Sequence, residues 1–156
     1  MTMNKNLGVG ALCLGVGLGL GLGAVGAAAA DTRAPVEYFS AGPDAAYSSA
    51  VRVGDVLYLS GQIGIRPDGS IPEGIEAQTR LALENMDATL KSLGSSMDAV
   101  FKCTAMLEDM STWADFNKVY VTFFKPGRLP ARSSFGTDGL ALGVLVELVC
   151  LAHSPQ

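Results

Sequence analysis

The 156 residues carry 11 basic and 15 acidic side chains, which give a net charge of −4. A chain of this length has room for one domain, and its acidic balance argues against nucleic acid as a partner, because phosphate binding needs a basic surface. Three cysteines and one histidine provide neither a His/Cys ligand cluster nor a Ser-His-Asp triad, so we expect no metal and no cofactor.

Residues 1–30 have the pattern of a secretory signal peptide. Lys5 supplies a positive start, residues 7–26 form an uncharged Leu/Gly/Val/Ala run, and Ala28-Ala29-Ala30 resembles a small-residue cleavage site. An uncleaved membrane anchor is the alternative, because the run is nearly long enough to span a bilayer. Its glycines and its Ala-rich end favour cleavage. We therefore expect residues 31–156 to form one domain of a periplasmic or secreted protein, which has no membrane partner after signal cleavage.

The mature chain begins with short extended segments. Residues 36–39 are expected at a sheet edge. Residues 47–53 and 56–60 are β-rich, and Gly54-Asp55 between them is typical of a hairpin with a type I′ or II′ turn. These segments predict an antiparallel start to the sheet.

A helix is predicted over residues 75–93, with Gly94 directly after it. Its apolar stripe recurs at three- and four-residue steps, and it consists of Ile75, Thr79, Ala82, Met86, Leu90 and Leu93. Two acid–base pairs at i,i+4, Glu76/Arg80 and Asp87/Lys91, fall on the opposite side. The helix should therefore pack on one side only.

A mostly buried strand is expected at residues 100–107, followed by a second helix. Thr112 with Asp115 three residues later predicts a variant of the capping box. The aromatic stripe of this helix is typical of core packing rather than of a cofactor site, and it consists of Trp113, Phe116, Tyr120 and Phe123. The last strands are expected at residues 131–135 and 145–152.

Cys103 and Cys150 both fall in predicted strands. An oxidising compartment permits a disulfide between them. Buried free thiols are nevertheless the commoner state of cysteines in apolar strands, so we expect two free thiols.

The order β-β-α-β-α-β-β predicts an α+β domain in which two helices cover one face of a mixed sheet. The other face would expose apolar side chains unless another molecule covers it. This favours a homo-oligomer that buries the open face.

Arg132 and Glu147 are charged residues in segments that otherwise resemble buried strands. Such charges are rarely buried unless they are paired. One interpretation is a mutual salt bridge between two strands. The other is an anion-binding pocket, in which the guanidinium fork of Arg132 faces a substrate carboxylate.

From about Tyr47 to Ala152 the chain resembles the RidA/YjgF family of enamine/imine deaminases. The matching pieces are Tyr47-Ser48, Ser60-Gly61-Gln62-Ile63, Gln78-Thr79, Asn85, Asp109-Met110, Asn117, Tyr120, Pro130-Ala131-Arg132-Ser133 and Val146-Glu147. Their order and spacing carry the resemblance together. It implies a chorismate-mutase-like α+β fold and a homotrimer with ligand clefts between subunits.

The resemblance also implies a cofactor-independent hydrolase that converts small 2-imino acids or enamines to 2-oxo acids and ammonia. Arg132 matches the family's carboxylate-binding arginine, and Glu147 matches the glutamate that orients the attacking water. The implied substrate-binding residues are Tyr47, Ser60, Gly61, Asn117 and Ser134. Ser134 stands where many members have a cysteine, which leaves a backbone contact possible but removes thiol chemistry.

The predicted export does not fit this activity easily, because pyridoxal-phosphate enzymes normally make such imines in the cytoplasm. A non-catalytic exported protein that binds a small carboxylate in the same cleft is therefore the alternative function. The family has also been described as endoribonuclease and as chaperone. The acidic charge and the lack of a paired acid and base make ribonuclease the weaker of these here.

Overall fold

The computed structural model describes residues 33–154, and the signal peptide predicted at residues 1–30 lies outside them. Its strands are β1 (Val36–Ser40), β2 (Ser48–Val53), β3 (Val56–Leu59), β4 (Gln62–Ile63), β5 (Val100–Leu107), β6 (Ala131–Gly136) and β7 (Val146–His153). Its α-helices are α1 (Ile75–Ser92) and α2 (Trp113–Tyr120), and its 3-10 turns are η1 (Met97–Ala99), η2 (Met110–Thr112), η3 (Val121–Phe123) and η4 (Ala141–Gly143). Within these residues, no helix has both the length and the apolar character needed to cross a membrane.

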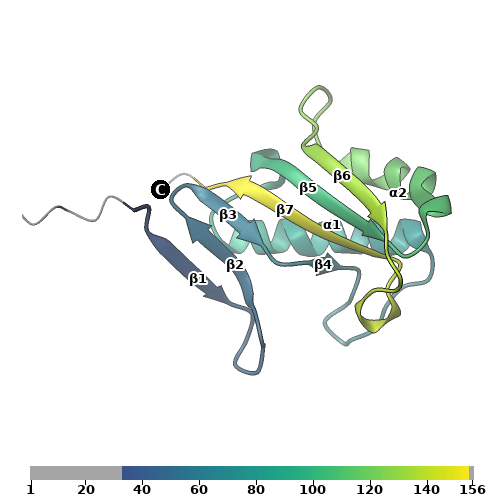
Figure 1. Ribbon diagram of the computed structural model, residues 1–156, viewed down its shortest axis with the longest axis horizontal. Helices are drawn as coiled ribbons and strands as arrows, with labels where there is room; N and C mark the ends of the chain where they lie inside the picture. Colours follow the sequence, from purple (N-terminus) through teal and green to yellow (C-terminus); the bar gives the residue numbers. More distant parts are fainter. Residues whose placement is uncertain (1–32, 155–156) are drawn as a thin grey trace, which may run out of the picture. The chain divides into compact units, whose positions relative to one another are not determined.

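The strands form one mixed sheet in the order β1-β2-β3-β7-β5-β6, with β4 paired to β7 beside this path. β5 and β6 run parallel, and the other described pairs are antiparallel. Both α-helices lie on the same face of the sheet (Figure 1). The predicted α+β architecture is therefore confirmed, with β1 at the expected sheet edge and β4 as a short addition.

The β2–β3 hairpin forms as its turn sequence predicts. Val53 pairs with Val56, so Gly54 and Asp55 are the two loop residues. Gly54 has a φ of +61°, whereas Asp55 keeps a negative φ. A positive φ at the first loop residue alone favours type II′ over type I′, and only glycine adopts it there without strain.

Alternation along the strands gives the sheet one buried face and one open face. Toward the helices lie fully buried side chains from three adjacent strands, namely Leu57, Leu148, Cys150, Cys103, Ala105 and Leu107. They pack with α1 side chains that include Ala82, Leu83, Met86 and Leu90. Most residues of the apolar stripe predicted for α1 are thus buried in the core against the sheet.

The open face carries an apolar row that crosses four strands. Tyr38, Val51, Tyr58 and Leu151 are successive register partners across β1, β2, β3 and β7. Tyr38 is 72% exposed and Tyr58 is 47% exposed. A row of large apolar side chains on one side of a sheet is the kind of surface that a protein partner covers.

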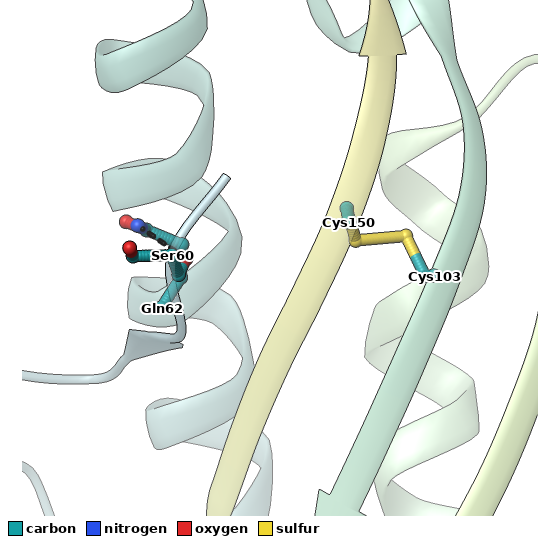
Figure 2. The surroundings of a disulfide bond; sticks show 4 residues. All are labelled: Ser60, Gln62, Cys103 and Cys150. Atoms are coloured by element: carbon teal, nitrogen blue, oxygen red, sulfur yellow. Dashed lines mark hydrogen bonds between the residues drawn. A yellow bond between two sulfur atoms is a disulfide. The ribbon is translucent and has the colours of Figure 1, made fainter. Parts of the chain in front are cut away.

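The expectation of two free thiols is wrong, because Cys103 and Cys150 form a disulfide. The two cysteines are register partners on the antiparallel strands β5 and β7, with their Cα atoms 4.1 Å apart. Figure 2 shows the bond joining the two strands. The cysteines are separated by 47 positions in the sequence, so their spacing does not indicate that they are neighbours, and only the strand register reveals it.

The predicted capping box at α2 is also wrong. The Thr112 side chain makes no cap hydrogen bond, and Asp115 pairs instead with Lys118. The turn before α2 is fixed by Asp109, whose carboxylate accepts a hydrogen bond from the Ser111 backbone N–H at 2.8 Å. The capping residue is therefore Asp109, directly before η2, and not Thr112 as the sequence pattern indicated.

Candidate active site

Arg132 lies on the edge strand β6 with its side chain directed toward the helices. It is the register partner of Cys103, whose buried side chain faces the helices. The guanidinium carbon of Arg132 lies 4.4 Å from the ring centroid of Tyr120, 5.3 Å from that of Phe116 and 5.7 Å from that of Trp113. All three rings come from one side of α2, so the arginine is held by aromatic faces through cation–π attraction.

The guanidinium group of Arg132 lacks a hydrogen-bond partner among the described residues. Its Nη1 atom is sealed from solvent and has no hydrogen-bond partner. None of the ion pairs found within residues 33–154 includes Arg132. Because a buried donor without a partner is costly, such a group usually marks the place of a water or a ligand.

Arg132 faces a small pocket of about 190 Å³ between α2 and the start of β6. Asn117, Tyr120, Val121, Leu129 and Pro130 complete its lining. Two predicted site residues, Arg132 and Asn117, are thus brought together. Ser134 lies two residues further along the same face of β6, and its Oγ is also sealed without a partner.

Glu147 lies at the start of β7 on the open face of the sheet. It is three residues from Cys150, whose side chain faces the helices, so strand alternation turns it to the opposite side. The salt bridge with Arg132 that the sequence left open is therefore not formed within one chain. The sheet itself separates the two charges.

Gly61 provides the space in which the Glu147 carboxylate lies. A Cβ atom at residue 61 would lie 1.7 Å from Oε1 of Glu147 and 2.7 Å from its Cδ. Any side chain at this position would force Glu147 to move. The glycine predicted as a binding residue thus has a steric role that is visible in the structure.

Ser60 and Tyr47 belong to the same region as Gly61. The Ser60 hydroxyl donates a 2.6 Å hydrogen bond to the Ser48 carbonyl, while Tyr47 is 65% exposed. Tyr47 and Gly61 line a groove of about 500 Å³ that also contacts Leu142. Leu142 has a φ of +58°, a strained value for a non-glycine residue.

Two amide side chains of α1 hold the backbone near Glu147, one just before it in the chain and one on the neighbouring strand β4. Gln78 accepts a 2.7 Å hydrogen bond from the Leu145 N–H. Asn85 donates 2.9 Å hydrogen bonds to the Ile63 and Ile65 carbonyls, and Ile63 is the register partner of Glu147. These contacts give a physical reason why Gln78 and Asn85 are among the residues that match the family.

The predicted site residues therefore form two groups within one chain. The first group consists of Arg132, Asn117 and Ser134 on the helix side, and the second consists of Tyr47, Ser60, Gly61 and Glu147. None of the pockets described contains members of both groups. In the part of the chain that the structure describes, no three His, Cys, Asp or Glu residues are placed to hold a metal ion.

The aromatic residues around Arg132 were not predicted as part of the site. Their helical spacing indicated core packing, and Phe116 and Tyr120 are indeed buried. Trp113 is 39% exposed, which a core residue at that spacing would not be. The only sign in the sequence that these rings also hold a guanidinium was Arg132 in the strand that follows the helix.

Comparisons with known proteins agree on one family. The family model described as endoribonuclease L-PSP matches residues 39–154. A mouse protein named 2-iminobutanoate/2-iminopropanoate deaminase is 36% identical over 108 residues, which cover 68% of this chain and 79% of that relative. A RutC family protein from Pyrococcus horikoshii is 39% identical over 113 residues, which cover 71% of this chain and 89% of that protein.

Solved structures share the fold. The crystal structure of YyfA, a protein of the conserved Rid family from Yersinia pestis, superimposes with a TM-score of 0.71 at 34% identity. The match covers 76% of this chain and 99% of that one. The arrangement of sheet and helices described above is therefore shared with YyfA over almost its whole length.

Proposed function

Since the chain belongs to the RidA/YjgF family, whose model is described as endoribonuclease L-PSP, we propose that it hydrolyses small 2-imino acids or enamines to 2-oxo acids and ammonia. The mouse relative that carries the deaminase name supports the reaction class. Arg132 and Glu147 are the residues that we assign to the chemistry.

The observation that carries the proposal is the free fork of Arg132. Its guanidinium is held by rings rather than by a carboxylate, and Nη1 has no partner. A 2-imino acid presents a carboxylate directly beside its C=N carbon. When the carboxylate binds to the guanidinium through two parallel hydrogen bonds, the reactive carbon has a fixed position.

The hydrolysis needs little more than that position and a held water. The water oxygen adds to the imine carbon and one water proton moves to the nitrogen. The second water proton then moves to the nitrogen as the C–N bond breaks, the carbonyl forms and ammonia leaves. Arginine stays protonated and cannot act as base, so the carboxylate of Glu147 is the group that orients the water or accepts its proton. Free imines already hydrolyse unaided, so positioning by a few groups is enough.

A second copy of the chain would unite the two groups of site residues. Within one chain Arg132 and Glu147 face opposite sides of the sheet, and the open face carries an uncovered apolar row. We propose a homotrimer in which the Arg132 group of one subunit meets the Glu147 group of the next. Burial of the apolar row would stabilise this assembly.

We further propose that the protein is exported and that its mature N-terminus lies near Asp31. The family match begins at residue 39, so the predicted signal peptide precedes the whole domain. The Cys103–Cys150 disulfide is consistent with an oxidising compartment. N-terminal sequencing of the native protein tests the export, and residues 1–30 still present in a soluble cytoplasmic fraction would refute it.

The function is tested by a coupled assay on the mature protein. An amino-acid oxidase generates 2-imino acids, and the appearance of 2-oxo acid is followed with and without the protein. We expect faster hydrolysis with the wild type and near-background rates with Arg132→Ala. Arg52→Ala is the matched control, because Arg52 also stacks on a ring but is paired with Glu37.

The same assay separates catalysis from the alternative, an exported small-carboxylate-binding protein. That alternative predicts 2-oxo acid binding that depends on Arg132 but no acceleration of imine hydrolysis. Full hydrolysis by a folded Arg132→Ala protein would end the assignment of this site.

A further inference from the structure

Two half-buried arginines of the sheet are held in different ways. Arg52 has its Nη1 atom 2.9 Å from a Glu37 carboxylate oxygen, in addition to the Phe39 ring beneath its guanidinium. Arg132 has three rings and no carboxylate. A carboxylate partner would compete with an incoming anion for the guanidinium fork. Neutral rings hold the plane of the guanidinium and leave its N–H groups available.

Tyr120 is the nearest of the three rings, with its centroid 4.4 Å from the guanidinium carbon. It is 2% exposed, and it is packed between Phe116 at 5.4 Å and Phe124 at 4.8 Å between ring centroids. Packing on both sides fixes the position of this ring. Arg132 therefore rests on a rigid surface rather than on a mobile side chain.

The hydroxyl of Tyr120 contributes nothing visible to this arrangement. It is sealed from solvent and has no hydrogen-bond partner. Burial raises the pKa of Tyr120 to about 12, although the charge of Arg132 opposes this shift. The phenol is therefore neutral at physiological pH, and it acts on Arg132 through its ring face rather than as a phenolate.

We propose that Tyr120 is a positioning residue for Arg132, whose ring sets the orientation in which the guanidinium receives a substrate carboxylate. This inference rests on the proposed function, because it takes the carboxylate of a 2-imino or 2-oxo acid as the ligand. The ring acts through Arg132, and the hydroxyl is dispensable.

The experiment compares Tyr120→Phe, Tyr120→Leu and the control Phe124→Leu in the full mature protein. Phe124 is a buried aromatic of the same cluster that packs on Tyr120 rather than on the guanidinium. The readouts are KM and kcat for imine hydrolysis, and 2-oxobutanoate affinity by calorimetry. Trp113, the single tryptophan of the chain and 5.7 Å from the guanidinium carbon, adds a fluorescence signal for binding.

We expect Tyr120→Phe to match the wild type in all readouts. Tyr120→Leu should raise KM and weaken 2-oxobutanoate binding by about tenfold, with a smaller change in kcat, because the carboxylate contact is made in both ground and transition states. Phe124→Leu removes packing on Tyr120 but leaves the ring beside the guanidinium, so it should raise KM much less than Tyr120→Leu. If Tyr120→Leu does not fold, Tyr120→Met replaces it with a flexible side chain that fills the gap.

Three results would overturn the inference. Equal loss in Tyr120→Phe and Tyr120→Leu would mean that the hydroxyl contacts the ligand directly. The same KM change in Phe124→Leu would reduce the effect to core packing, and unchanged affinity in Tyr120→Leu would mean that the ring is not needed. Failure of the proposed function itself is distinct, because the wild type would then not accelerate imine hydrolysis, whereas the effect of Tyr120→Leu on 2-oxobutanoate affinity would still test the ring.

Discussion

Arg132 and Glu147 keep their polar ends available by opposite means. Aromatic faces hold the guanidinium, whereas the missing side chain of Gly61 makes room for the carboxylate. In both cases the chain fixes the stem of the side chain without using its hydrogen-bonding groups. Such preorganisation lets a site bind a ligand without first breaking internal bonds.

Gly61→Ala tests the steric role of the glycine. The added methyl group would lie 1.7 Å from Oε1 of Glu147, so the carboxylate must leave its position. We expect imine hydrolysis to fall by about 100-fold, as small displacements of reacting groups cost that much. The affinity for 2-oxobutanoate should fall much less, because Arg132 is untouched.

A double variant provides the control for this prediction. If Gly61→Ala acts only by displacing Glu147, combining it with Glu147→Gln should add little further loss, since both changes remove the same interaction. Losses that multiply in the double variant would contradict the steric account. Full activity in Gly61→Ala would contradict it more directly.

The sequence supplied candidate site residues, whose roles stay a prediction, but it did not show how they are grouped. Their identities followed from a matching pattern of motifs. The division into two faces depends on the register of β5 with β6 and β7, which decides that Arg132 and Glu147 point in opposite directions. The rings beside Arg132 were missed because helical spacing describes how a helix packs and not what it packs against.

At the level of elements, local patterns predicted the strands and helices well. Periodicity placed α1 and β5, and the turn residues placed the β2–β3 hairpin. The predictions that failed depend on contacts beyond the local pattern. Thr112 had the right residue type for a cap, yet Asp109 fixes the turn, and the cysteine pair is visible only from the register of two strands.

The disulfide gives a prediction at this scale. Both cysteines are fully buried between β5 and β7, so reductant should not reach them in the native protein. We expect native protein to resist reduction without denaturant and to gain two hydrogens in intact mass after reduction in denaturant. In freshly purified protein that begins at Asp31 and so lacks Cys13, free thiols that titrate after denaturation would contradict the pairing.

Removal of the disulfide should lower the free energy of unfolding. The bond closes a loop with a sequence separation of 47, for which chain entropy predicts a loss of roughly 4 kcal/mol. Cys103→Ala combined with Cys150→Ala adds cavities to this loss, so the reduced wild type is the cleaner comparison. Denaturant unfolding of oxidised and reduced protein measures the difference.

At the scale of the whole molecule, the proposed trimer depends on the open face of the sheet. Tyr58 lies within the apolar row, between Val51 and Leu151, and it is 47% exposed in one chain. Tyr58→Glu should yield a folded monomer, because a buried unpaired charge disfavours the interface while solvent accepts it in the monomer. Hydrolysis should disappear with the trimer, since the two groups of site residues would no longer meet.

Ala88→Glu is the matched control for this prediction. It adds the same charge on an exposed position of α1, away from the open face of the sheet. Light scattering should give a trimer for the wild type and Ala88→Glu and a monomer for Tyr58→Glu. A monomeric wild type at micromolar concentration would remove the basis for a shared site, as would an active monomer.

The proposed reaction requires Arg132 to bind the carboxylate of the substrate, and a comparison of charged and neutral ligands tests this role. The affinities of wild type and Arg132→Ala are compared for 2-oxobutanoate and for its neutral amide, which has the same shape without the charge. We expect the wild type to prefer the acid by about tenfold or more and Arg132→Ala to bind both compounds equally weakly. An Arg132→Ala protein that still prefers the acid by the wild-type factor would contradict the account.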